Sequence, residues 1–265
     1  MSAWYHADMA GKAGFGVWGA ESGKWRCCIL SFMVKRGKLI VIDGTDGVGK
    51  ATQTKLLVAR LKKEGVPVKT LDFPQYYKNF FGHFIGAMLT GEYGDFLHMD
   101  PFVASVMYAA DRFESKPKIE KWLADGYTVI LDRYVSANQL HQAGKIKDAK
   151  KRKYFLKWLD TMEHKVFGLP RPDLIIYLHL PMKSVVKLLK QKDAVRKKRY
   201  AKGKKDTVEQ DTAYLEAAQK SALELIKTSR NWKKIECANP GGGILLREEI
   251  SEKIYTLASR GLIRK

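Results

Sequence analysis

The sequence predicts an α/β fold in which helices cover both faces of a doubly wound sheet of about five parallel strands. Short and almost entirely apolar stretches recur along the chain, and longer stretches with apolar residues at helical spacing separate them. A strand buried on both faces of a parallel sheet has this continuous apolar character. Polar motifs directly follow several of the apolar stretches, and such folds bind ligands at the carboxyl ends of their strands. We therefore expect a ligand site at that edge of the sheet.

The elements follow one another regularly from residue 38. The stretch KLIVIDG (38–44) is the first expected strand, and residues 51–64, with Leu57 and Leu61 one helical turn apart, are the first expected helix. Further strands are predicted at 67–73, 128–132, 173–180 and 232–238. Further helices are predicted at 102–125, 151–166, 182–195, 208–228 and 248–257. No linker interrupts the alternation, so residues 35–265 are expected to form a single domain.

Composition and charge limit the classes of partner. Of 265 residues, 45% are hydrophobic and 11% aromatic, which is ordinary for a globular protein. The 48 Lys and Arg residues against 28 Asp and Glu give a net charge of +20, which predicts attraction to nucleotides, nucleic acids or anionic membranes without choosing among them. The apolar runs are shorter than the roughly 20 residues of a membrane helix, so no membrane partner is expected. Three cysteines without metal-ligand spacing favour a reducing cytoplasm.

The first 34 residues are rich in glycine and show no helical or strand period. We expect residues 1–34 to be a poorly ordered N-terminal extension, or the product of an upstream start codon in a protein that begins at Met33. A targeting segment is the alternative, although its apolar stretch is too short for a convincing secretory signal.

A glycine-rich loop joins the first expected strand to the first expected helix. It fits the pattern G-x-x-x-x-G-K and consists of Gly44, Thr45, Asp46, Gly47, Val48, Gly49 and Lys50. In this pattern, backbone N–H groups and the helix N-terminus bind phosphate oxygens, and the lysine adds a mobile positive charge. The pattern then requires a hydroxyl residue that holds magnesium, but Ala51 stands there and Thr52 follows. The motif predicts a nucleotide phosphate site, and a simple tight turn is the alternative.

The motif LDRY (131–134) directly follows another expected strand. Asp132 is placed there to hold magnesium through water, and the Arg133 guanidinium to bind a phosphate with two N–H groups. A solvated salt bridge between Asp132 and a lysine is the alternative.

The stretch YAADR (108–112) lies in an expected helix. Tyr108 and Arg112 are four residues apart and share a helix face. The tyrosine ring could stack on a base while the guanidinium reaches an exocyclic oxygen of that base. By itself, such a pair more often combines a core residue with a surface residue.

Residues 183–205 form a strongly basic run with a single acid, Asp193. A mobile lid at about 193–207 would close over a triphosphate and bring Arg196 and Arg199 to the charge that develops during phosphoryl transfer. A solvated helix end or a nucleic-acid patch is the alternative.

Together these motifs resemble the thymidylate kinase family, which are nucleoside monophosphate kinases with the P-loop NTPase fold. The resemblance covers the chain from about Lys38 to its C-terminus and depends on the order of IDGTDGVGKATQT, DFPQY, YAADR, LDRYVSANQLHQ and DTVEQD. It implies transfer of the γ-phosphate of ATP to dTMP, giving dTDP and ADP, with Mg²⁺ as cofactor. It also implies a homodimer.

The resemblance implies roles on the donor side. Lys50 and the loop from Gly44 to Thr52 would hold the ATP phosphates. Magnesium would be held largely through water by Asp46 and Asp132, which would make Ala51 tolerable. A plain glycine at Gly47 is similar to members that supply the catalytic arginine from the lid, here Arg196 or Arg199.

On the acceptor side, Asp46 and Arg133 would flank the acceptor phosphate. Tyr108 would stack on thymine, and Arg112 would read its O4. The remaining residues that match acceptor contacts are Phe73, Tyr76, Asn138 and His141. Glu209 matches an acid at the hinge of the lid.

The chain departs from the family pattern at three positions. Asp72 stands where many relatives have an arginine, His141 where some place a tyrosine against the deoxyribose, and Val208 where certain members have an aromatic residue. These departures leave open another pyrimidine acceptor, namely dUMP, UMP or a deoxynucleoside. A non-enzymatic protein that binds nucleic acid is the last alternative, disfavoured because its basic residues are not interleaved with base-stacking aromatics.

Overall fold

The computed structural model describes residues 35–95, 98–193 and 211–260, and for residues 191–193 it describes the backbone alone. The predicted extension at 1–34, Val208 and almost all of the predicted lid at 193–207 lie outside these residues. The expectations for those segments therefore stay predictions.

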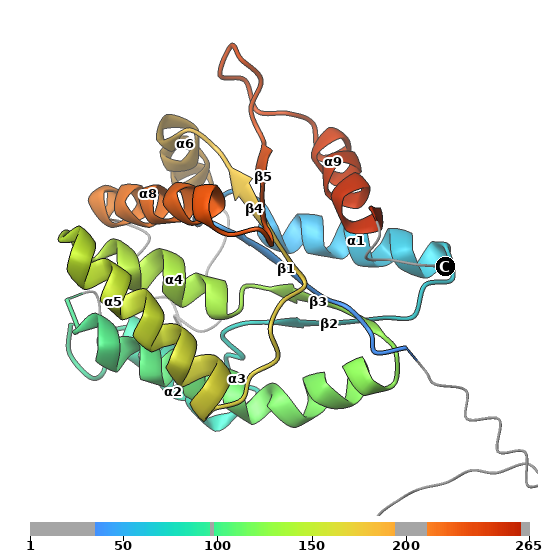
Figure 1. Cartoon of the computed structure of the whole chain (residues 1–265). Helices are drawn as coiled ribbons and strands as arrows, with labels where there is room; N and C mark the ends of the chain where they lie inside the picture. The colour runs from blue at the N-terminus through green and yellow to red at the C-terminus, as the bar shows by residue number, and fades with distance from the viewer. Residues whose placement is uncertain (1–34, 96–97, 194–210, 261–265) are drawn as a thin grey trace, which may run out of the picture. The chain divides into compact units, whose positions relative to one another are not determined.

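Five strands form one sheet at the centre of the described residues (Figure 1). They are β1 (Leu39–Gly44), β2 (Val68–Asp72), β3 (Thr128–Asp132), β4 (Leu174–His179) and β5 (Trp232–Glu236). All neighbouring strands pair in parallel, in the order β2-β3-β1-β4-β5. This confirms the predicted doubly wound parallel sheet, and each strand lies within the stretch predicted for it.

The central strand β1 explains why the apolar runs are continuous. Leu39 and Val41 pack on one face of the sheet, whereas Ile40 and Ile42 pack on the other. All four side chains are fully buried. Because successive side chains of a strand point to opposite faces, a strand covered on both sides is apolar at every position.

Helices cover both faces of the sheet. They are α1 (Lys50–Lys63), α2 (Phe80–Leu89), α3 (Pro101–Ala124), α4 (Val135–Gly144), α5 (Ala149–Asp160), the π-helix η1 (Thr161–Val166), α6 (Met182–Asp193), α8 (Thr212–Thr228) and α9 (Arg247–Ser259). The helices α1, α6 and α9 pack on the face that Ile40 and Ile42 reach, and α1 and α9 lie side by side (Figure 1). The helices α3 and α4 pack on the opposite face. Among the described residues, no helix is long and apolar enough to span a membrane.

Two helices were not predicted from the sequence. Helix α4 buries Ser136, Asn138, His141 and Gln142 alongside its apolar residues, so it has no clear apolar stripe. Helix α2, FFGHFIGAML, is apolar almost throughout and shows no polar face either. Apolar periodicity detects a helix with one apolar and one polar face, and neither sequence has that pattern.

The bounds of two predicted helices were wrong. The helix predicted at 151–166 is α-helical only to Asp160 and continues as η1, where the adjacent side chains Met162 and Glu163 are both buried. The helix predicted from residue 208 begins at Thr212, because the Asp211 side chain caps it by accepting a hydrogen bond from the Tyr214 N–H at 2.9 Å.

The strand register brings the polar motifs to one edge of the sheet. Asp132 at the end of β3 is level with Asp72 at the end of β2 and with Ile42 of β1. The chain crosses to β2 and β3 on one side of β1 and to β4 on the other, so β1 ends at the topological switch point where such sheets bind ligands.

Candidate active site

The loop between β1 and α1 has the conformation expected of a phosphate-binding loop. Gly47 and Gly49 adopt φ angles of 88° and 94°, which side-chain-bearing residues rarely adopt. Helix α1 begins at Lys50, and its N-cap residue Gly49 has no side chain that could cap the first N–H groups. The loop therefore presents uncapped amide donors and the positive end of a helix dipole to an anion.

The Lys50 side chain folds back over this loop. Its Nζ donates to the carbonyl oxygens of Gly44 at 3.0 Å and Thr45 at 2.9 Å. The side chain is largely buried, and burial, together with the nearby charge of Arg133, lowers the Lys50 pKa. Two backbone carbonyl oxygens thus hold the ammonium group at the loop.

Arg133 reaches the same loop from the end of β3. Its φ of 65° is unusual for a residue with a side chain, and strained backbone of this kind clusters at functional sites. Its guanidinium donates to Asp46 Oδ1, and its Nη1 donates to His141 Nε2 at 2.8 Å. Lys50 Nζ lies 3.6 Å from the same Asp46 oxygen. One carboxylate therefore lies between two cations.

Two further ionisable groups at this point have shifted pKa values. Burial raises the pKa of Asp132 to about 6, despite the opposing charges of Lys50 and Arg133. Burial, followed by the charge of Arg133, lowers the pKa of His141 to about 3. A neutral His141 that accepts a hydrogen bond at Nε2 carries its proton on Nδ1, and this buried atom has no partner among the described residues.

One cavity of about 500 Å³ connects the loop with the predicted acceptor side. It is lined by the loop residues Asp46, Gly47, Val48, Gly49, Lys50, Ala51 and Thr52. It is also lined by the predicted acceptor residues Phe73, Tyr76, Tyr108, Arg112, Arg133, Asn138 and His141. Gly44 and Thr45, the first two residues of the loop, do not line the cavity. A side chain at Gly44 would meet the Leu178 carbonyl oxygen at 2.7 Å.

Three of the predicted residues lie outside the described part of the chain. These are Arg196 and Arg199, expected in the lid, and Glu209, expected at its hinge.

The unexpected carboxylate at Asp72 has a cationic neighbour. Lys78 Nζ donates to Asp72 Oδ1 at 2.8 Å, and Gln75 Nε2 donates to the same oxygen at 3.0 Å. Asp72 lines the cavity, so Lys78 partly neutralises a negative charge at its wall.

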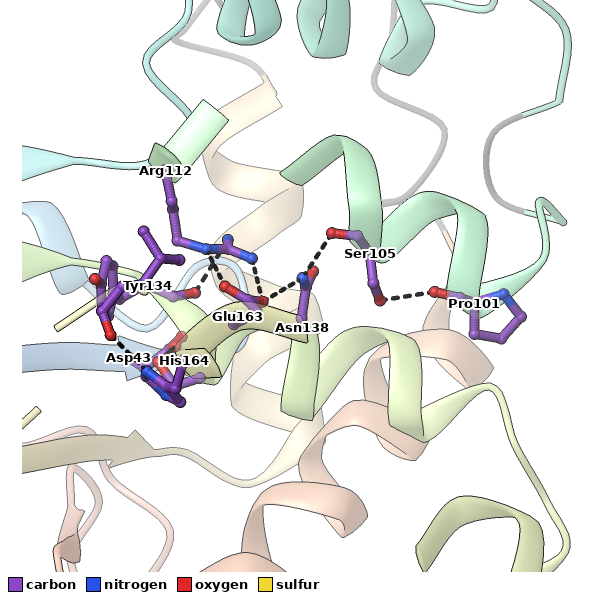
Figure 2. A network of polar contacts seen from close by, with 10 residues as sticks. Asp43, Pro101, Ser105, Arg112, Tyr134, Asn138, Glu163 and His164 are labelled. Atoms are coloured by element: carbon purple, nitrogen blue, oxygen red, sulfur yellow. Dashed lines mark hydrogen bonds and ion pairs between the residues drawn. The ribbon is translucent and has the colours of Figure 1, made fainter. Parts of the chain in front are cut away.

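A residue that sequence reasoning missed lies below the acceptor side of the cavity. Glu163 of η1 is fully buried and forms an ion pair with Arg112, and it also accepts a hydrogen bond from Asn138 (Figure 2). Nothing local in the sequence marks Glu163, because an acidic residue within a predicted helix normally faces water.

The residues at the loop fit a magnesium ion that binds substrate phosphates. Asp46 and Asp132 supply carboxylate oxygens, and magnesium commonly binds one or two carboxylates together with phosphates and water. The buried hydroxyls Thr45 Oγ1 and Thr54 Oγ1 have no hydrogen-bond partner in the part of the chain that the structure describes. No cluster of three or more His, Cys, Asp or Glu side chains encloses a metal site within the described ranges.

A parallel sheet with a phosphate loop at its switch point, and one cavity that extends from this loop past Arg133, define a phosphotransferase of the P-loop fold. A sequence model of the family described as thymidylate kinase matches residues 42–244. The chain belongs to the thymidylate kinase family.

Individual relatives agree with this family. The chain is 28% identical over 205 residues to the thymidylate kinase of Homo sapiens, covering 77% of this chain and 84% of that protein. It is 26% identical over 226 residues to the thymidylate kinase of Danio rerio, covering 84% and 94%. A solved thymidylate kinase structure from Candida albicans superposes with a TM-score of 0.64 at 22% identity, covering 84% of this chain and 91% of that one, which shows the shared fold.

Proposed function

We propose that the protein transfers the γ-phosphate of ATP to dTMP and releases dTDP and ADP. The observation that carries this proposal is the single cavity that joins the phosphate loop to a pocket with an aromatic ring and a buried arginine. A kinase must hold the phosphates of donor and acceptor in line. A continuous cavity with Lys50 and Arg133 in its wall is suited to that arrangement.

The loop and its cations would contribute to catalysis mainly by positioning the phosphates and by stabilising their negative charge. Loop amides and Lys50 would bind the donor phosphates, and Arg133 would leave Asp46 to bind the acceptor phosphate. The acceptor is already a phosphate oxyanion, so no side chain has to remove a proton from it. Catalysis of this kind depends on alignment and on stabilising the transferring group's charge. Arg196 and Arg199 of the lid would complete that stabilisation.

Asp46 and Asp132 would hold Mg²⁺. When bound, the ion would neutralise negative charge on the donor phosphates. Burial favours the neutral form of the Asp132 carboxyl, and a cation beside it would favour the ionised form that ligates metal.

The nucleobase of the acceptor would lie between Tyr108 and the floor of the cavity. Tyr108 is one helical turn from Arg112 on α3, so its ring can cover a base whose exocyclic oxygen Arg112 reads. Phe73, Tyr76, Asn138 and His141 would complete this pocket.

We further propose a homodimer in a reducing cytoplasm. Phe80 of α2, Phe113 of α3 and Val166 of η1 expose 72%, 46% and 72% of their surface. Glu114 accepts hydrogen bonds from the Phe80 and Phe81 N–H groups, and Phe113 contacts Phe167, so these apolar side chains lie on one surface. A second copy of the chain would cover them. The buried free thiol of Cys237 suits a reducing compartment.

Incubation with ATP, Mg²⁺ and dTMP tests the proposal, with dTDP measured by chromatography. Lys50→Ala should abolish turnover, because it removes the cation at the donor phosphates. Lys55→Ala is the matched control, since Lys55 is exposed on the same helix. If dTMP, dUMP and UMP all remain unphosphorylated by the wild type, the proposed function is wrong.

A further inference from the structure

The π-helix η1 places an acidic side chain where a regular helix was expected. It continues α5 and carries Glu163, whose backbone oxygen accepts a hydrogen bond from the Leu169 N–H at 2.9 Å. His164 Nδ1 lies 2.8 Å from the Leu169 carbonyl oxygen. Single π-helical turns are rare and occur often at functional sites, so the turn raises the question of what Glu163 does.

The Glu163 carboxylate binds two cavity residues at once (Figure 2). Its Oε2 accepts from Arg112 Nε at 2.8 Å, and its Oε1 accepts from Arg112 Nη2 at 2.5 Å. The same Oε1 accepts from Asn138 Nδ2 at 2.8 Å. A single oxygen atom therefore fixes the spacing between the Arg112 guanidinium and the Asn138 amide.

This arrangement determines the orientation of the Asn138 amide. Its Nδ2 donates to the Ser105 carbonyl oxygen at 3.1 Å as well as to Glu163. Both partners can only accept, so the nitrogen must face them and the oxygen must face away. No described residue donates to Asn138 Oδ1, and Asn138 lines the cavity. A ligand therefore meets this residue as a hydrogen-bond acceptor.

The same carboxylate balances the charge of Arg112, so the Arg112–Glu163 pair is neutral as a whole while Arg112 still donates N–H groups. Nη1 donates to the Tyr134 carbonyl oxygen at 3.3 Å, and Nη1 and Nη2 each carry a second N–H that no described residue accepts. An unpaired guanidinium in so buried a place would be costly, whereas the pair with Glu163 neutralises it. The cavity thus presents N–H donors of Arg112 beside the acceptor Asn138 Oδ1.

We propose that Glu163 is a positioning residue that sets the base selectivity of the acceptor site. It does so by holding an acceptor at Asn138 and a donor at Arg112 at a fixed spacing. This inference rests on the proposed function. Thymine and uracil carry a donor at N3 and an acceptor at O4, and so complement this pair. Cytosine carries an acceptor at N3 and a donor amino group at C4, and so opposes both. Glu163 does not line the cavity and acts only through its two partners.

The test compares dTMP with dCMP as acceptors for Glu163→Gln and Glu163→Asp. The glutamine replaces one acceptor oxygen by a donor and leaves Arg112 unpaired. The aspartate keeps the charge, which favours folding, but is one methylene too short to reach both partners. A polar site rejects the wrong hydrogen-bonding pattern strongly, so the wild type should favour dTMP in kcat/KM on the order of 10⁴-fold.

Both variants should lower the dTMP over dCMP ratio by at least about 10-fold, mainly through a higher dTMP KM, while the ATP KM changes by less than about 2-fold. His164→Ala is the matched control, because it weakens the same π-turn without touching Arg112 or Asn138. It should lower the Tm and leave the ratio unchanged.

A purely structural role for Glu163 would make its variants behave like His164→Ala. The inference is overturned if Glu163→Asp keeps the wild-type ratio of kcat/KM for dTMP over dCMP. If Glu163→Gln does not fold, the result for Glu163→Asp alone tests the inference. Failure of the proposed function is a separate result, namely a wild type that does not phosphorylate dTMP.

Discussion

Arg133 donates a hydrogen bond to Asp46 across the junction of the two halves of the cavity. Lys50 approaches the same carboxylate to 3.6 Å, so Asp46 pairs with both cations. Substrate phosphates would replace Asp46 as the partners of these cations. The Asp46 carboxylate would then repel the phosphates unless a metal ion lies between them. This relationship makes the role of Asp46 measurable apart from catalysis.

Asp46→Asn should tighten ATP binding in the absence of magnesium but not in its presence. Without the metal, the variant should bind ATP more tightly than the wild type, by about 3- to 10-fold, because a negative charge next to the phosphates is gone. With Mg²⁺ the advantage should disappear, since the variant also loses a metal ligand. Calorimetric titration measures both affinities, and Asp125→Asn, on the surface of the protein, is the control. An equal effect under both conditions would show that Asp46 does not act through the metal.

The raised pKa of Asp132 predicts a pH-dependent stability. The folded-state pKa is about 6, above the usual value of 3.8, so the folded protein binds this proton more tightly than the unfolded chain does. The stability that the protonated carboxyl supplies is complete below about pH 4 and is lost as the pH rises to about 6. Urea unfolding should be measured for the wild type and for Asp132→Asn. The free energy of unfolding of the variant, relative to that of the wild type, should increase from about pH 4 to about pH 6 and stay constant at higher pH. A difference independent of pH would contradict the shifted pKa.

Lys78 should support acceptor binding from the edge of the cavity. Lys78→Ala leaves Asp72 without its cation and should raise the KM for dTMP by about 2- to 5-fold, a modest change because both side chains are more than half exposed. Asp72→Asn should lower that KM or leave it unchanged. Both effects should shrink in high salt, which screens exposed charges. Lys121→Ala breaks a comparable surface pair and serves as the control. A lower KM for dTMP in Lys78→Ala would contradict this role of Lys78.

The exposed apolar surface of α2 and α3 should control assembly. Phe80→Lys combined with Phe113→Lys places charges on both helices and should convert a dimer into a monomer in sedimentation experiments. Tyr154→Lys alters another exposed aromatic residue, on α5, and should leave the association state unchanged. A wild type that is monomeric at micromolar concentration would reject the proposed dimer.

Much of the fold could be predicted because its signals are local. The apolar runs at 38–44 and 173–180 identify strands that are buried on both faces, and the loop glycines identify their own turn. Helix α4 escaped prediction because its buried face is largely polar, and this face carries Asn138 and His141 into the cavity.

Glu163 could not be predicted for a different reason. Its partner Arg112 is 51 positions away along the chain, and only the packing of η1 against α3 and α4 brings the two together. Arg112 itself was proposed from the sequence because it shares a helix face with Tyr108 and because YAADR resembles a motif of the thymidylate kinase family. A local sequence pattern can thus indicate a candidate ligand-binding residue such as Arg112. It cannot indicate the buried carboxylate of Glu163, which pairs with that residue.

A crystal structure with ADP, Mg²⁺ and dTMP bound together tests the central proposal most directly. We expect the ADP β-phosphate on the amides between Gly47 and Lys50, and the dTMP phosphate on Arg133, which has left Asp46. The thymine should lie under Tyr108 with its O4 toward Arg112. Nucleotides bound elsewhere, or an Arg133 still paired with Asp46 above an empty acceptor pocket, would contradict the proposed active site.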